Sequence, residues 1–259
     1  NGRYDVTHEI TFCIHGIILK LKGKSLYGQK HKHPIASISV KLSIVMYSLW
    51  RRSMPDNARP TILPANHMYV SGLDQNDANH VALSPLSFLA RAALIYPNKP
   101  AVVHGQTTQT WLETYNRCRQ LASAIQSHGL GLGDTVAVML PNTPPMVEAH
   151  FGIPLSGAVL NSLNTRLDAS TIAFMLSHGE AKMVIVDAEF APVMQEALTI
   201  LKHDTGRSPI VIDALDEAFV KTELRLGLKT YDEMLAQADP DFAFTLPNDE
   251  WQSVCLNYT

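Results

Sequence analysis

Residues 129–145 read GLGLGDTVAVMLPNTPP, and this stretch decides the fold class. Its glycines make a tight turn, and Val136–Leu140, which follows them in the sequence, is continuously apolar. A strand that is apolar on both sides is typical of a parallel sheet with helices on both faces. Pro141–Pro145 then starts a helix, because proline is favoured in the first helical turn. The order of turn, buried strand and helix predicts one repeat of an α/β fold.

The same alternation extends towards the N-terminus. Ser84-Pro85 predicts the start of a helix that ends before Pro97, and residues 101–104 form a short apolar strand. Thr110-Trp111-Leu112-Glu113 is a capping box, so a helix is expected from Thr110 to Gly129. Its apolar residues recur at helical spacing and include Cys118, with Arg117, Arg119 and Gln120 on the face expected to be solvated.

The alternation also continues towards the C-terminus. Asp168 and Asp187 can each cap a helix, and apolar strands follow at 183–186 and 210–212. Thr230–Glu233 is a second capping box, and residues 254–258 read as a final strand. Strands and helices in alternation predict an α/β fold with a mostly parallel sheet covered by helices.

Composition excludes several classes of protein. The 259 residues are 46% hydrophobic and 17% charged with a formal net charge of −3, which is unlike collagen or a disordered chain. A transmembrane helix needs about 20 mostly apolar residues, and no such run exists, so a soluble protein is expected. Cys13, Cys118 and Cys255 lie far apart without a CxxC pair, which favours a reducing, cytoplasmic setting.

Charge divides the chain near residue 53. Residues 1–53 hold nine Lys or Arg and two acidic residues, whereas the remainder holds 12 basic and 22 acidic residues. We therefore expect residues 1–65 to be a basic leader and flexible segment outside the fold, and residues 66–259 to be the folded domain. Upstream sequence read in frame before Met54 or Met68 is the preferred explanation. The rival explanations are a targeting leader and a basic arm for nucleic acid, which has no recognisable module around it.

Motifs that carry chemistry are absent. Gly23-Lys24-Ser25 fails as a phosphate loop because Ile18 stands where glycine is required, and Gly129–Gly133 follows a helix and lacks the third glycine of a dinucleotide fingerprint. No G-x-S-x-G or H-E-x-x-H sequence occurs. His150 is better explained as a satisfied core or boundary residue than as a catalyst, and His104 and His178 as surface or capping residues. Asn164-Thr165-Arg166 and the pair Asp232-Glu233 are better explained as a polar loop and a helix start.

A series of short segments nevertheless runs in a fixed order through the chain. They are Leu83–Leu89, Tyr96–Pro97, Thr110–Trp111, Arg117, Gly133–Val136, Leu140–Asn142, Gly157–Asn161, Leu163–Leu167 and Leu256–Thr259. Together they resemble the N-terminal part of the adenylate-forming enzymes, above all the AMP-forming fatty-acyl-CoA synthetases of the medium-chain type. The resemblance covers residues 70–259 and implies an incomplete N-terminal domain that stops at the family's Gly-rich phosphate loop.

The resemblance implies a reaction and its participants. A carboxylic acid, here a fatty acid, attacks the α-phosphate of ATP to give an acyl-adenylate and pyrophosphate, and the thiolate of coenzyme A then displaces AMP. Such a polyanion is held by a backbone cradle, a lysine and Mg²⁺. By this resemblance the hydroxyl of Thr259 contacts phosphate or Mg²⁺, and Tyr258 sets the end of the strand.

Other parts of that family's site have no counterpart here. The Gly-rich loop, the adenine-binding motif, the ribose-binding aspartate and the C-terminal catalytic lysine are missing from the sequence, so no catalytic residue is assigned. We predict that this chain alone does not adenylate an acid. The alternatives are a truncated, non-catalytic module that pairs with a full-length subunit, and a ligase for another acid such as an aryl acid or an amino acid. No nucleic acid partner is expected.

Overall fold

The structure, a computed structural model, describes part of the chain in two units. The described residues are 6–14, 17–25, 63–74, 76, 78–216 and 224–258. The units are Asn1–Asp74 and Gln75–Thr259. In the first, β1 (Val6–Ile14) and β2 (Ile17–Ser25) pair antiparallel. The proposed division between residues 65 and 66, with the earlier part outside the fold, stays a prediction.

The second unit is built on a five-stranded parallel sheet in the order β8-β7-β5-β6-β9. The strands are β5 (Thr135–Met139), β6 (Val159–Ser162), β7 (Ala181–Asp187), β8 (Ile210–Ala214) and β9 (Cys255–Leu256). This arrangement confirms the predicted α/β class with a mostly parallel sheet. Among the described residues no helix is long and apolar enough to cross a membrane.

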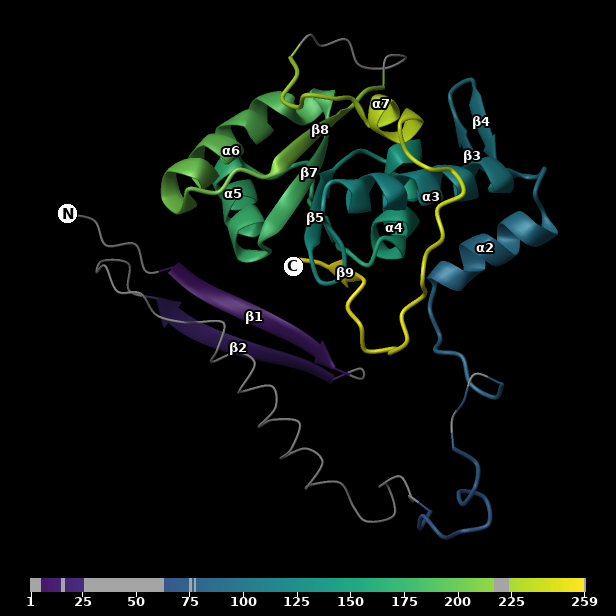
Figure 1. Ribbon diagram of the computed structural model, residues 1–259. Coiled ribbons are helices and arrows are strands. Elements are labelled where there is room, and N and C mark those ends of the chain that lie inside the picture. Colours follow the sequence, from purple (N-terminus) through teal and green to yellow (C-terminus); the bar gives the residue numbers. More distant parts are fainter. Residues whose placement is uncertain are drawn as a thin grey trace. The chain divides into compact units, whose positions relative to one another are not determined.

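Helices cover both faces of this sheet (Figure 1). One face carries α3 (Trp111–Ser127), α4 (Pro144–Leu155) and α7 (Tyr231–Ala236), and the other carries α5 (Ala169–His178) and α6 (Ala191–Thr205). The chain moves from β5 to β6 in one direction and then back across the sheet to β7 and β8. Because parallel crossovers are right-handed, this reversal sends the connecting helices to opposite faces.

The central strand shows why its sequence is continuously apolar. Val136 and Val138 face the α3 and α4 layer, whereas Ala137 and Met139 face the α5 and α6 layer, and all four side chains are fully buried. Successive side chains of a strand point to opposite faces, so a strand covered on both sides needs apolar residues at every position.

Smaller elements pack against α3. They are α2 (Leu86–Ile95) and the hairpin of β3 (Pro100–His104) and β4 (Thr107–Thr110). Thr110 and Glu113 form the predicted capping box at the start of α3, and Thr230 and Glu233 form the second one at α7. Asp168 caps α5 as predicted. These local signals were correct because each depends on residues only three positions apart.

Several sequence-based details were wrong. Strand β6 was not predicted, and the final strand is two residues long instead of five. Asp187 caps a single 3₁₀ turn, Ala188–Phe190, that precedes α6.

In α4, Val147 is partly exposed while Ala149 and Gly152 are buried. A Cβ on Gly152 would lie 2.7 Å from Leu121, so α4 turns its small residues towards α3.

Candidate functional site

The carboxyl ends of β5, β7 and β8 surround a polar pocket of about 260 Å³. The loop after β5 leads to α4 on one face of the sheet, and the loop after β7 leads to α6 on the other. A crevice opens where two such loops diverge, and ligands of open α/β sheets bind in crevices of this kind. The polar residues that line it are His104, Thr107, Gln109, Arg117, Thr143, Asp187, Asp216 and Asp232.

One wall of the pocket carries the carboxylates of Asp187 and Asp216, and His104 contacts the second of them. His104 Nε2 lies 2.7 Å from Asp216 Oδ2, although the two residues are 112 positions apart. Burial raises the pKa of Asp187, and the charges of Glu189 and Asp216 raise it further. The sequence assigned His104 a capping or surface role. The sequence does not predict the contact between His104 and Asp216, because no short-range pattern connects β3 with the end of β8.

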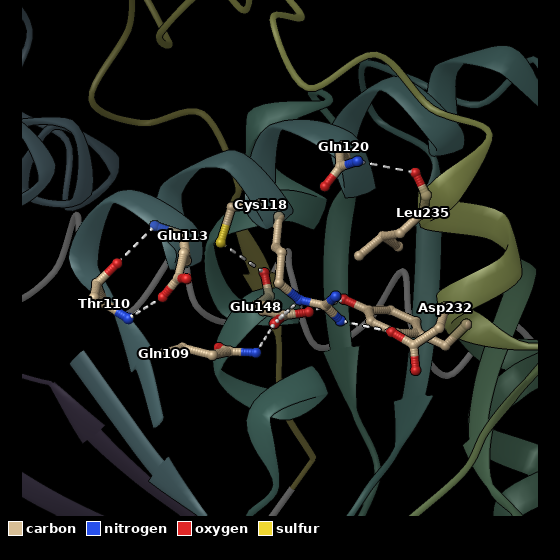
Figure 2. Close-up of polar contacts among 10 residues, drawn as sticks. Gln109, Thr110, Glu113, Cys118, Gln120, Glu148, Asp232 and Leu235 are labelled. Carbon is tan, nitrogen blue, oxygen red and sulfur yellow. Dashed lines mark hydrogen bonds and ion pairs between the residues drawn. The ribbon is translucent and has the colours of Figure 1, made fainter. Parts of the chain in front are cut away.

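A fully buried carboxylate, Glu148 on α4, contacts Arg117 and Gln109, which line the pocket. Figure 2 shows the polar contacts of Glu148. Its Oε1 accepts hydrogen bonds from Arg117 Nε at 2.6 Å and from Gln109 Nε2 at 3.2 Å. Its Oε2 accepts a hydrogen bond from the hydroxyl of Tyr231 at 2.8 Å. Arg117 Nη2 also donates to Asp232 Oδ1 at 2.8 Å. The Glu148 cluster, as we call these five residues, therefore connects α3, α4, β4 and α7.

The ionic states within the Glu148 cluster follow from these contacts. Burial alone would lower the pKa of Arg117, but its hydrogen bond and charge interaction with Glu148 raise the pKa above the ordinary value. Burial raises the pKa of Tyr231, and the neighbouring Glu148 charge raises it again. Arg117 is therefore a permanent cation and Tyr231 a permanent neutral donor at physiological pH.

Arg117, Arg119 and Gln120 of α3 were expected on a solvated face, but they are only partly exposed and each has a partner within the fold. Arg117 reaches Glu148, Arg119 donates to the carbonyl of Phe242, and Gln120 donates to the carbonyl of Leu235. Helical periodicity identifies the apolar stripe but says nothing about which polar neighbours a long side chain meets. Cys118 lies on the buried face, as predicted.

The chain that follows β8 is fixed by a buried aspartate. Asp213 accepts backbone hydrogen bonds from Leu226 N at 3.1 Å and Gly227 N at 2.9 Å. These bonds bring residues 226–227 alongside β8. The pocket wall begins with the next residue, Ala214, and continues to Asp216.

Of the two residues predicted at the phosphate, Tyr258 is described, and it follows β9 at the other edge of the sheet. Thr259 is outside the described residues. Tyr258 turns its side chain towards α5, where its hydroxyl lies 2.9 Å from His178 Nδ1 and donates to the carbonyl of Met175 at 3.3 Å. Burial raises the pKa of Tyr258. The role of both residues at a phosphate stays a prediction.

Other residues singled out by the sequence have structural partners. His150 was expected in the core or at its boundary but is exposed, and its Nδ1 lies 2.8 Å from the carbonyl of Met146 in the same helix. Asn164 Oδ1 accepts a hydrogen bond from the backbone N–H of Arg166, as expected of a polar loop. In the part of the chain that the structure describes, no three His, Cys, Asp or Glu side chains gather as a metal site.

Comparison with known proteins identifies the family. The family described as "AMP-binding enzyme" matches residues 89–259, and the chain belongs to it. The chain is 47% identical over 197 residues to the acetate–CoA ligase CCL3 of Humulus lupulus. The aligned region covers 73% of this chain and 35% of the ligase. The chain is 42% identical over 197 residues to the peroxisomal acetate/butyrate–CoA ligase AAE7 of Arabidopsis thaliana, with the same two coverages.

Solved structures show the same fold. An anthranilate CoA ligase, AuaEII, in complex with anthranoyl-AMP matches 67% of this chain and 32% of its own, with a TM-score of 0.59 at 19% identity. A fatty acyl CoA synthetase of Mycobacterium tuberculosis matches the same shares with a TM-score of 0.56 at 25% identity. The chain spans about 35% of the curated relatives that it matches, in their N-terminal part. The predicted resemblance to this part of an adenylate-forming CoA ligase is confirmed.

Proposed function

We propose that this chain is the N-terminal portion of an AMP-forming acid–CoA ligase. The observation that carries the proposal is the family match over residues 89–259, supported by 47% identity to a protein named as an acetate–CoA ligase. The reaction is attack of a carboxylate on the α-phosphate of ATP, followed by displacement of AMP by the thiolate of coenzyme A. ATP and coenzyme A are its substrates, and a divalent metal such as Mg²⁺ neutralises phosphate charge.

The acid that we propose is an aliphatic fatty acid. The sequence resemblance pointed to medium-chain acids, whereas the relatives at 47% and 42% identity are named for acetate and for acetate and butyrate. These names favour the short end of the aliphatic series. The cytoplasm is the location expected from cysteine usage. Several relatives are named as peroxisomal, which makes the peroxisome the alternative to test.

Two residues of this chain are proposed at the ATP phosphates. Thr259 would offer its hydroxyl to a phosphate or to Mg²⁺, and Tyr258 would set the end of the strand that carries it. The contacts of Tyr258 with α5 support the second role, because they fix the residue directly before Thr259. No described residue is proposed as a catalytic acid or base.

The test begins with the coding sequence beyond codon 259, from which a longer product is expressed. Acid-dependent exchange between ATP and pyrophosphate is then measured with acetate, butyrate, octanoate and benzoate. We expect exchange from the longer product with the aliphatic acids and none from the 259-residue chain. Absence of exchange with every acid would overturn the ligase proposal.

Two outcomes would favour the alternatives. A preference for benzoate would assign the enzyme to another class of carboxylic acid. A stop codon directly after Thr259, together with binding of the chain to a full-length ligase subunit, would support the non-catalytic module. Exchange by the 259-residue chain itself would contradict our prediction that it is inactive alone.

A further inference from the structure

The last described strand is held weakly by its backbone. β9 contains two residues, and it pairs with β6 only at Cys255 with Leu160 and at Leu256 with Asn161. Two paired positions at the edge of a sheet fix the direction of the following chain only weakly. Side-chain contacts two residues beyond the strand supply what the short ladder lacks.

These contacts join Tyr258 to the last two turns of α5. Its hydroxyl meets His178 Nδ1 at 2.9 Å and the carbonyl of Met175 at 3.3 Å. Its ring packs edge-on against the rings of His178, at 5.7 Å between centroids, and Phe174, at 6.5 Å. The rings of Phe174 and His178 stack on each other at 5.5 Å. Tyr258 is therefore held by two hydrogen bonds and two ring contacts.

The hydrogen bonds also specify where the proton on His178 lies. A phenol has one proton, and Tyr258 uses it to donate to the carbonyl of Met175. A proton on Nδ1 is the arrangement in which both contacts are hydrogen bonds, because the phenol oxygen then accepts from His178 while its own proton goes to the carbonyl. The neutral ring is accordingly the Nδ1–H tautomer, which is fixed by the hydrogen bond it makes.

The platform beneath this contact is rigid. α5 begins at the Asp168 cap, and its inner residues Ile172, Ala173 and Leu176 are buried against the sheet. A side chain attached to the outer end of this helix is thus fixed relative to the core.

We propose that His178 is a positioning residue that acts through Tyr258 to fix the chain where it leaves β9 towards Thr259. The proposal rests on the proposed function, because it gives Thr259 a phosphate to meet. His178 itself touches no substrate. His178 holds Tyr258 in one place. Because β9 has only two paired positions, this contact is what orients the chain from Tyr258 towards Thr259.

The first test uses the 259-residue chain and needs no catalysis. Amide hydrogen exchange at residues 256–258 is compared among wild type, H178A, H178N and Y258F. Loss of one hydrogen bond is expected to speed exchange about three- to tenfold in H178A, and Y258F, which loses both hydrogen bonds of the hydroxyl, should exchange faster than H178A. H178N should restore protection, because its amide nitrogen stands where Nδ1 stood. H150A is the matched control, since His150 is an exposed helical histidine bonded only within its own helix turn in the described contacts.

A spectroscopic signature separates this role from mere packing. Nitrogen-15 NMR of His178 in the same chain should show the Nδ1–H tautomer in wild type and lose it in Y258F, which keeps the aromatic ring. Unchanged exchange in H178A, or an Nε2–H tautomer in the wild type, would overturn the proposal.

The second test uses the longer product described above. H178A should raise the KM for ATP about tenfold and leave the KM for the acid unchanged, and H178N should restore the wild-type value. Altered amide exchange with an unchanged KM for ATP would overturn the positioning role and leave only a structural contact. If the longer product has no ligase activity, the proposed function fails, whereas the amide exchange of the 259-residue chain still decides whether His178 holds Tyr258 in place.

Discussion

Replacing Glu148 with glutamine tests whether the Glu148 cluster stabilises the fold. The substitution keeps the shape of the side chain and removes its charge. Glu148 accepts three hydrogen bonds, from Arg117, Gln109 and Tyr231, and its side chain has no exposure to solvent. An amide has one acceptor oxygen and two N–H donors, so at least one of the donors that face it loses its partner.

The size of the effect follows from the burial of the partners. Removing one member of a fully buried ion pair costs about 3–5 kcal/mol. Arg117 keeps its bond to Asp232, and 28% of its side chain is exposed, so water relieves part of the loss. We therefore expect E148Q to lower the free energy of unfolding by about 2–3 kcal/mol, because a charge-assisted hydrogen bond contributes about 1.5–3 kcal/mol.

The measurement is urea unfolding followed by circular dichroism, with the midpoint compared at an unchanged slope. Y231F leaves Glu148 Oε2 without its donor and should cost about 1–2 kcal/mol. The double variant should cost less than the sum, since the two residues are in contact. E196Q is the control, because Glu196 is exposed on α6, and surface changes stay within about 0.5 kcal/mol. An E148Q midpoint equal to that of E196Q would refute the reasoning.

Two further predictions concern packing and pH. G152A should destabilise the chain by about 1–3 kcal/mol, because the new Cβ would lie 2.9 Å from the carbonyl oxygen of Cys118. G131A should be neutral, because its Cβ would meet nothing closer than 3.8 Å. Thermal unfolding of both variants checks this. Hydrogen bonds from Ser170 and Thr171 lower the pKa of Asp168 to about 2. Its stabilising contribution is therefore complete above about pH 4 and lost as the pH falls towards 2, which a carboxyl NMR titration and acid unfolding of D168N would show.

Much of the fold could be predicted because its signals are local. Capping boxes at Thr110 and Thr230 and the cap at Asp168 depend on residues three apart, and each lies where the sequence placed it. The short strand β6 was missed because Val159–Ser162 has neither a long apolar run nor clear alternation. The final strand was predicted too long, because strand length depends on the partner strand, which the local sequence does not reveal.

The sequence by itself determined the class of fold, the central buried strand and the resemblance to CoA ligases, because apolar periodicity and motif order are properties of neighbouring residues. Only the tertiary structure decided which polar groups meet. Glu148 and Tyr231 are 83 positions apart, and His178 and Tyr258 are 80 apart. The crossovers that return the chain across the sheet bring such pairs together. A hydrogen bond of this kind depends on distance in space, which a one-dimensional pattern does not contain.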